Sequence, residues 1–328
     1  MLQKLKKKLL ISIALAGLLY LGFTIYADFG HVAEAFRNFN WLFLPILLLC
    51  SVCNYMVRFS KWDYYLRIIN VKMSKIDSLS VFMSGLVMSV TPGKMGELLK
   101  AYLVKQLKGT SISKTAPIIF VERITDFVSL MLIALAGAYY YNYGRTIVII
   151  VAVFFFVVIV FLSNRKIALP ILKLMEKNDF LNKHLSKIHN AYESSYLMLR
   201  PFPLLKMTVV SLFSWFFECL GYYLILRNFP INIPNLLLWS AFSYCFATIV
   251  GAISMLPGGL GVTEGSLTFM LVQKGVPNQY AVASTFIIRA VTLWFAVLIG
   301  VISISIYQKR FGKIIIEPEK VRSLNGTV

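Results

Sequence analysis

The sequence predicts an all-α integral membrane protein with six full transmembrane helices and two re-entrant broken hairpins, arranged as an inverted internal repeat. Three observations support this prediction: the composition is strongly apolar, long apolar runs recur along the chain, and one proline–glycine pattern occurs twice. Of the 328 residues, 58% are hydrophobic and 14% are charged. Soluble domains are about 45–50% apolar and about 25% charged, so a single transmembrane domain over residues 1–328 is expected.

The apolar runs place the six full helices in order along the chain. The first follows a cluster of lysines and is longer than the apolar core of a signal peptide, which is about 7–15 residues, so we expect it to be retained. A polar and basic segment, residues 164–205, is expected at the cytoplasmic surface between the fourth and fifth helices. The expected full helices cover residues 9–26, 41–57, 116–139, 146–162, 207–226 and 280–306.

Two further apolar stretches are interrupted by proline and glycine. One has arms at residues 79–90 and 98–104, and the other has arms at residues 236–255 and 267–272. The arms of the first stretch are shorter than the roughly 20 residues that a span needs, which favours a re-entrant hairpin, and the second stretch has the same proline–glycine break. Proline removes a backbone donor and glycine permits unusual dihedral angles, so a regular helix is not expected at the tips. The tip residues are Pro92, Gly93, Gly96, Pro257, Gly258, Gly259 and Gly261.

The distribution of basic residues gives the orientation. With the N-terminus and C-terminus in the cytoplasm, most of the 33 lysines and arginines lie in cytoplasmic loops. This bias is the positive-inside rule, and it explains the net charge of +19 without any nucleic acid. Residues 58–75, which include Arg58, Lys61 and Arg67, are expected in one of these loops. We therefore expect a multi-pass protein of the cell membrane.

The two halves of the chain match at a nearly constant offset. Pro257 follows Pro92 by 165 residues, and Arg289 follows Arg123 by 166. This offset predicts a duplication, with repeat one at about residues 41–139 and repeat two at about 206–307. In the orientation above the two copies are inverted, so the hairpin tips meet near the middle of the membrane. Many secondary transporters share this architecture.

Ionisable side chains within the apolar segments are the candidates for substrate binding. Burying one in a membrane costs about 2.5–3.5 kcal/mol on insertion scales, so such residues usually serve a function. The candidates are Arg123, Arg289, Lys94, Glu97, Glu122, Asp126, Glu218 and Glu264. No catalytic motif, phosphate-binding loop or nucleotide fingerprint occurs, so neither an enzyme nor a cofactor is expected.

Arg123 and Arg289 lead these candidates because a buried guanidinium offers paired donors that suit phosphate. For Arg123, a structural ion pair with Asp126, three residues further on, is an equal alternative. Glu122 and Asp126 share a helix face. Arg289 has no acid nearby in its own helix, which favours contact with a ligand.

The remaining candidates each have two interpretations. Glu97 and Glu264 follow the two breaks, where the dipole of a half-helix favours a carboxylate. The alternative is that they bind an ammonium group or a coupling proton. Glu218 lies in the middle of a helix and is either a proton carrier or the partner of an arginine. Lys94, at the first tip, either touches a lipid phosphate or faces water.

The four cysteines lie in apolar stretches. Cys50 and Cys53 form a C-x-x-C pair, which can be redox-active or bind a metal. Neither a second pair nor a nearby histidine accompanies them, so buried structural thiols are favoured and no metal site is expected.

Three motifs together resemble a known family, the transmembrane domain of lysylphosphatidylglycerol synthase/flippase proteins. They are Pro-Gly-Lys-Met-Gly-Glu at 92–97, Val-Glu-Arg-Ile-Thr-Asp at 121–126 and Leu-Pro-Gly-Gly-Leu-Gly-Val-Thr-Glu at 256–264. The resemblance covers nearly the whole chain and implies movement of lipids between leaflets. The soluble aminoacyl-transferase domain of the full synthases has no counterpart in this sequence.

The leading hypothesis is therefore a lipid flippase that moves a modified phospholipid, similar to an aminoacyl-phosphatidylglycerol, or a polyprenyl-linked lipid. The candidates hold five carboxylates against three bases, which favours a cationic head group. The alternative is a membrane component of a lysyltransferase or glycosyltransferase system that acts on lipid head groups. Membrane lipids are the expected partners. A second copy of the chain and a lipid-modifying enzyme remain open as partners.

Overall fold

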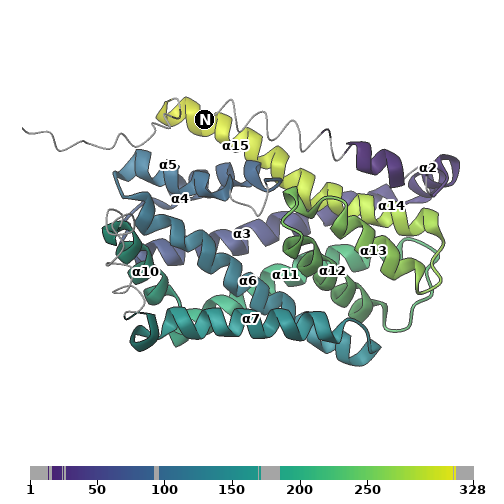
Figure 1. Ribbon diagram of the computed structural model, residues 1–328. Coiled ribbons are helices and arrows are strands. Elements are labelled where there is room, and N and C mark those ends of the chain that lie inside the picture. Colours follow the sequence, from purple (N-terminus) through teal and green to yellow (C-terminus); the bar gives the residue numbers. More distant parts are fainter. Residues whose placement is uncertain are drawn as a thin grey trace, which may run out of the picture.

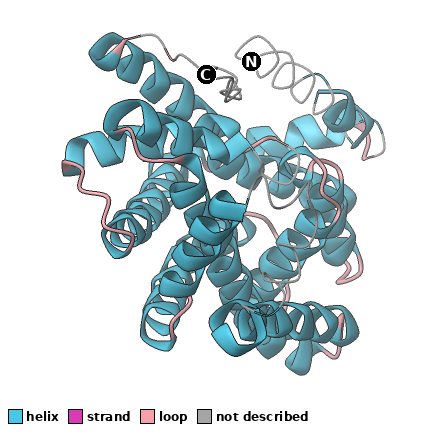
Figure 2. Ribbon diagram, turned by 60° about the vertical axis from the view of Figure 1, so that its left-hand side comes forward, coloured by secondary structure: helices cyan, strands magenta, loops and turns pink. Residues whose placement is uncertain are grey.

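The computed structural model describes residues 14, 17–23, 25, 27–91, 96–168, 170, 185–312 and 314, and all regular elements among these residues are helices. The helices form a bundle in which α7 runs along one side and α15 along the opposite side (Figure 1). Short loops join the described helices (Figure 2). The predicted all-α class is confirmed for this part of the chain.

The long helices are α3 (Leu44–Ile68), α6 (Ile112–Tyr141), α7 (Arg145–Ser163), α11 (Pro201–Arg227) and α12 (Leu236–Ile253), followed by α14 (Asn278–Arg289), the π-helical turn η5 (Ala290–Trp294) and α15 (Phe295–Phe311) as one continuous run. The shorter elements are α2 (Phe29–Asn38), η1 (Trp41–Phe43), α4 (Lys75–Gly85), η2 (Leu86–Met88), α5 (Leu99–Lys108), α10 (Leu185–Met198), η4 (Pro257–Gly259) and α13 (Val262–Val272).

Five helices in the described residues are long and apolar enough to cross a membrane. They cover Trp41–Ile68, Arg145–Ser163, Pro201–Arg227, Leu236–Ile253 and Asn278–Phe311. Four of them coincide with predicted full helices, whereas Leu236–Ile253 was expected to be one arm of a hairpin. Helix α6 contains the whole of the predicted third helix, residues 116–139, and carries several ionisable side chains. The predicted first helix lies mostly outside the described residues, and the re-entrant geometry stays a prediction.

Helix α3 corrects one expectation from the sequence. It continues from Leu44 to Ile68, so Arg58, Lys61 and Arg67 belong to the helix and not to a cytoplasmic loop. Lys61 is 1% exposed. The helix continues through these charged residues, and a carboxylate of α6 replaces water as the partner of two of them: Asp126 pairs with Lys61 and lies 3.8 Å from Arg58.

The two predicted breaks interrupt the helices in both halves. In the first, η2 follows α4, and Pro92, Gly93 and Lys94 lie outside the described residues. The Thr91 hydroxyl joins the two flanks, since it accepts a hydrogen bond from the Gly96 N–H at 2.9 Å. In the second, Pro257 opens η4, and the glycines at 258, 259 and 261 have φ of 60°, 67° and 82°, values that favour glycine.

The helices of the two halves pack against one another reciprocally. Helix α3 packs against α11, α4 packs against α15, and α12 packs against α6. The breaks also approach each other, because Val90 and Leu260 lie in one apolar cluster with Leu293 and Val297. The duplication itself stays a prediction. The orientation of the two halves relative to the membrane stays a prediction.

The π-helical turn η5 lies where the last helix crosses α3. The Phe295 N–H bonds to the Ala290 carbonyl, five residues back. The carbonyl oxygens of Val291 and Thr292 accept hydrogen bonds from two α3 side chains, Ser51 Oγ at 2.6 Å and Tyr55 OH at 3.0 Å. These bonds supply partners for the backbone groups that the wider turn displaces.

Candidate functional site

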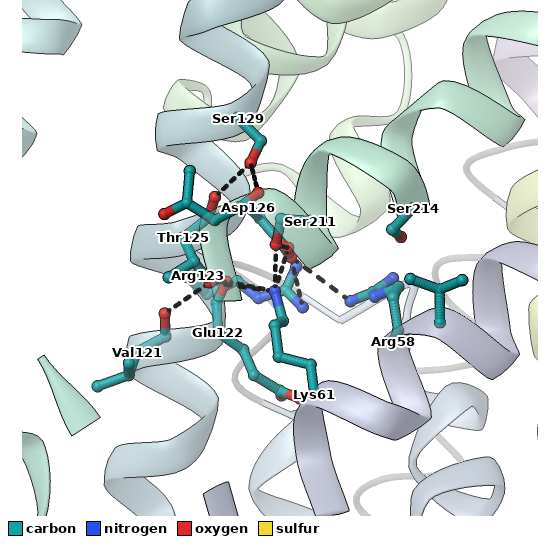
Figure 3. Close-up of polar contacts among 12 residues, drawn as sticks. Arg58, Lys61, Val121, Glu122, Arg123, Thr125, Asp126, Ser129, Ser211 and Ser214 are labelled. Carbon is teal, nitrogen blue, oxygen red and sulfur yellow. Dashed lines mark hydrogen bonds and ion pairs between the residues drawn. The ribbon is translucent and has the colours of Figure 1, made fainter. Parts of the chain in front are cut away.

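A cluster of charged side chains lies between α3, α5, α6 and α11, in the interior of the bundle (Figure 3). We call it the charge cluster. Its members are linked by ion pairs and hydrogen bonds, and its middle lies about halfway along α6. It consists of Arg58, Lys61, Glu97, Lys100, Glu122, Arg123 and Asp126, with the hydroxyls of Thr125 and Ser211.

Asp126 is the centre of the charge cluster. Its Oδ1 receives hydrogen bonds from Lys61 Nζ at 2.5 Å and from Ser211 Oγ at 3.0 Å. Its Oδ2 lies 3.3 Å from Arg123 Nη2 and 3.8 Å from Arg58 Nη2. One carboxylate on α6 therefore contacts three cations, two from α3 and one from its own helix, as Figure 3 shows.

Lys100 forms the second ion pair of the charge cluster. Its Nζ donates to Glu122 Oε2 at 2.7 Å and lies 3.6 Å from Glu97 Oε2. The ammonium group also lies over the Trp62 ring, 4.7 Å from its centroid. The aliphatic part passes so close to Gly85 that a Cβ there would lie 2.5 Å from Lys100 Cγ. Glycine at position 85 thus makes room for the buried lysine.

Exposure divides the charge cluster into two layers. The side chains of Lys61, Lys100, Glu122 and Asp126 are 1–3% exposed, whereas those of Arg58 and Arg123 are 15% and 17% exposed. The inner layer consists of lysines paired with carboxylates, as expected for buried charges. The two guanidinium groups form the accessible layer, so they are the charges that an incoming ligand meets first.

A second ion pair occurs at the corresponding place in the other half. Arg289 Nε donates to Glu264 Oε1 at 2.7 Å, and its Nη2 donates to the Gly258 carbonyl at 2.6 Å. In the first half, Arg123 Nη2 pairs with Glu97 Oε2 at 3.4 Å. In both halves, therefore, the carboxylate after the break pairs with the arginine of the next helix. The second pair is tighter, and Glu264 is fully buried.

Glu218 lies outside both ion pairs. It belongs to α11, and its Oε2 accepts a hydrogen bond from Tyr244 OH at 2.6 Å. Among the described residues, Glu218 has no contact within ion-pair range of Arg58, whose ion pair is with Asp126. Across all the residues that the structure describes, no group of three or more His, Cys, Asp or Glu side chains is arranged to hold a metal ion.

The structure brings together four of the predicted site residues, Glu97, Glu122, Arg123 and Asp126, and separates them from the Arg289–Glu264 pair. Arg289 pairs with no acid of its own helix, but it has an acidic partner in Glu264 of α13. The predicted Lys94, Pro92 and Gly93 lie outside the described residues. Which of these residues bind substrate stays a prediction.

Sequence reasoning did not name Arg58, Lys61 or Lys100 as candidates, since it placed the first two in a loop and Lys100 in an arm of the first hairpin. With them, the described ionisable groups of the two ion-paired sites and Glu218 number five cations and five carboxylates. The excess of carboxylates that favoured a cationic head group therefore disappears. One signal was present: Asn54, Arg58, Lys61 and Tyr65 follow the spacing of one helix face, which continues past the end of the apolar run at residue 57.

Comparison with known proteins gives consistent results. A family model described as the lysylphosphatidylglycerol synthase TM region matches residues 9–300. A UPF0104 membrane protein of Methanocaldococcus jannaschii is 26% identical over 225 residues, which cover 69% of this chain and 95% of the relative. Similar proteins from Methanothermobacter thermautotrophicus and Pyrococcus horikoshii are 22% and 24% identical; the matches cover 84% and 80% of this chain, and 88% and 86% of those relatives.

Proposed function

The chain belongs to the family of the lysylphosphatidylglycerol synthase transmembrane region, and we propose that it moves a lipid between the two leaflets of the membrane. The candidate lipids are a modified phospholipid and a polyprenyl-linked lipid. Both carry phosphate close to the boundary between the head group and the apolar chains. Translocation breaks no covalent bond, so the proposal assigns no catalytic residue to this chain.

The observation that carries the proposal is the accessible layer of the charge cluster. Seven ionisable side chains meet between helices that are otherwise apolar. Placing each of these side chains in the membrane costs about 2.5–3.5 kcal/mol on insertion scales. A protein that served only as a membrane anchor would not need them. Arg58 and Arg123 remain 15% and 17% exposed, although the bundle buries the groups behind them. These arginines offer a polar group a place to bind between apolar helices.

The arrangement of the two halves supports the same proposal. The breaks of both halves approach each other through Val90 and Leu260, and the packing of helices is reciprocal. Transporters use such breaks to hold a polar substrate, while one half moves against the other. The carboxylate–arginine pairs that follow both breaks give each half a comparable polar group.

The proposal is tested with purified protein in liposomes that contain a lipid with a fluorescent head group. A membrane-impermeant quencher added outside removes the fluorescence of the outer leaflet, and translocation exposes the rest. We expect faster loss with the protein than in protein-free liposomes. Arg123→Gln should slow it about tenfold or more, because a charged hydrogen bond in a site contributes about 1.5–3 kcal/mol.

Arg227→Gln is the matched control, since Arg227 is an exposed arginine at the end of α11. It should leave the rate unchanged. Equal rates with wild-type protein and without any protein, for phospholipid and polyprenyl-phosphate probes alike, contradict lipid translocation.

A further inference from the structure

We propose that Arg58 and Arg123 form a phosphate site that selects lipids whose head group carries a net negative charge. This inference rests on the proposed function for one point only, that the ligand is a lipid. It differs from the expectation of a cationic head group, and it assigns contact with the ligand to Arg58, a residue that the apolar pattern of the sequence places in a loop.

The first argument is the unused donor capacity of the two arginines. A guanidinium group has five N–H donors. Among the described residues, Arg58 makes no hydrogen bond, and its one ion pair, with Asp126, is 3.8 Å long. Arg123 donates one hydrogen bond, to Glu97 at 3.4 Å, and its buried Nε has no partner. Arg123 Nε is a buried donor, and buried donors are normally satisfied. The other free N–H groups of the two arginines belong to the accessible layer, so an acceptor can reach them between the two groups.

The second argument is that the carboxylates of the charge cluster are already in use. Among the described residues, Asp126 Oδ1 accepts hydrogen bonds from Lys61 and Ser211, while its Oδ2 accepts none and lies within ion-pair range of both arginines. Glu122 accepts from Lys100, and Glu97 pairs with both Lys100 and Arg123. All three carboxylate side chains are at most 8% exposed. A cationic head group would therefore have to displace a buried lysine or arginine before it met a negative charge.

The charges around the site also favour an anion. The charge cluster holds four cations, Arg58, Lys61, Lys100 and Arg123, against three carboxylates. The next carboxylate is Glu218, which Tyr244 already holds by a hydrogen bond of 2.6 Å. A phosphate can accept several of the free N–H groups at once, which matches the planar, paired donors of arginine.

The lysines act as positioning residues behind the arginines. Lys61 Nζ donates to Asp126, Ser211 and Thr125 at 2.5, 2.6 and 3.1 Å, which uses its three donors. It fixes the carboxylate that both arginines approach. The Arg289–Glu264 pair shows the opposite state, since Arg289 has two strong hydrogen bonds, one to Glu264 and one to the Gly258 carbonyl. Among the described residues, the two halves therefore differ in degree: Arg289 has two hydrogen bonds below 3 Å, whereas Arg58 has none and Arg123 has one at 3.4 Å.

Binding of short-chain lipids to the purified full chain in a non-ionic detergent tests this inference without any transport. Native mass spectrometry would compare dioctanoyl forms of phosphatidylglycerol, phosphatidylcholine and lysyl-phosphatidylglycerol, together with glycerol 1-phosphate. We expect phosphatidylglycerol to bind most tightly. Arg58→Gln should weaken it about 10- to 100-fold, the size of a lost charged hydrogen bond.

Arg67→Gln is the matched control, because Arg67 lies on the same helix and is 64% exposed. It should bind phosphatidylglycerol like the wild type. Thermal unfolding checks that each variant is folded. Arg58→Lys provides a milder change that keeps the charge and loses the paired donors, and its affinity should lie between those of the wild type and Arg58→Gln.

Equal or tighter binding of lysyl-phosphatidylglycerol overturns the inference, and so does an Arg58→Gln variant with unchanged affinity. Glycerol 1-phosphate binding as tightly as the lipid would also overturn it, because the site would then serve a soluble phosphate. Selective binding without translocation refutes the proposed function and leaves the phosphate site standing. Translocation that prefers a cationic lipid supports the proposed function and refutes the selectivity of the phosphate site for anionic lipids.

Discussion

Neutralising Asp126 tests whether this carboxylate holds the buried cations together. Asp126→Asn preserves the shape of the side chain but removes the negative charge shared by Lys61 at 2.5 Å, Arg123 at 3.3 Å and Arg58 at 3.8 Å. Lys61 is 1% exposed, so water cannot replace the lost partner. Removing one member of a buried ion pair costs about 3–5 kcal/mol, and we expect a loss of that size in the free energy of unfolding.

The double variant Lys61→Met/Asp126→Asn sharpens this test. It removes a cation together with the anion and fills the space of the lysine with an apolar side chain. Its loss of stability should be smaller than the sum of the two single losses by about 1–3 kcal/mol, the usual coupling between residues in contact.

Equilibrium unfolding in mixed micelles, with increasing sodium dodecyl sulfate, measures these differences. Asp63→Asn is the control, because Asp63 pairs with the exposed Arg67 on the surface of α3. It should change stability by about 1 kcal/mol or less. The reasoning is refuted if Asp126→Asn is no less stable than Asp63→Asn, or if the double variant shows strictly additive losses.

Two further predictions concern the second half of the chain. Gly300→Ala should destabilise the protein by about 1–3 kcal/mol, because the new Cβ would lie 2.0 Å from the Val87 nitrogen. Thermal unfolding measures this loss. The control is Gly221→Ala, whose Cβ would come no closer than 3.8 Å to a neighbour and which should show no loss. Equal melting temperatures for the two variants would contradict the close packing of Gly300 against Val87. Glu264→Gln leaves Arg289 buried without its counter-charge and should cost about 3–5 kcal/mol in the same detergent titration; a midpoint identical to the wild type would show that the pair does not hold this half together.

The apolar helices could be predicted from the sequence because their information is local. Helix α7 covers Arg145–Ser163, close to the expected 146–162, and its side chains mostly face outward, as a lipid-facing span requires. The mean hydropathy of a short sequence window is sufficient to predict such a helix, because a lipid-facing helix has uniformly apolar surroundings. The same holds for α11, which extends the expected 207–226 to Pro201–Arg227.

Helix α3 was mispredicted for the opposite reason. Its second half carries Arg58, Lys61 and Arg67, which a local window interprets as the end of a span. The partner that makes Lys61 acceptable inside the bundle is Asp126, 65 residues further along the chain. No local pattern shows that pairing. The sequence identified the carboxylates of the charge cluster and Arg123 as candidates, because they lie within or beside apolar segments. It did not identify Arg58, Lys61 and Lys100, because these cations lie close to other basic residues in the sequence.

The π-helical turn at 290–294 has a consequence for how the chain tolerates changes in length. A π turn encloses one residue more per hydrogen-bonded ring than an α turn. Deleting a single residue inside it leaves an ordinary α turn, and the face of α15 that packs on α4 keeps its direction. A deletion within α15 before Gly300 rotates every later side chain by about 100° and carries Gly300 away from Val87. The π turn is therefore a position where a one-residue deletion can shorten the last helix without rotating the residues that follow.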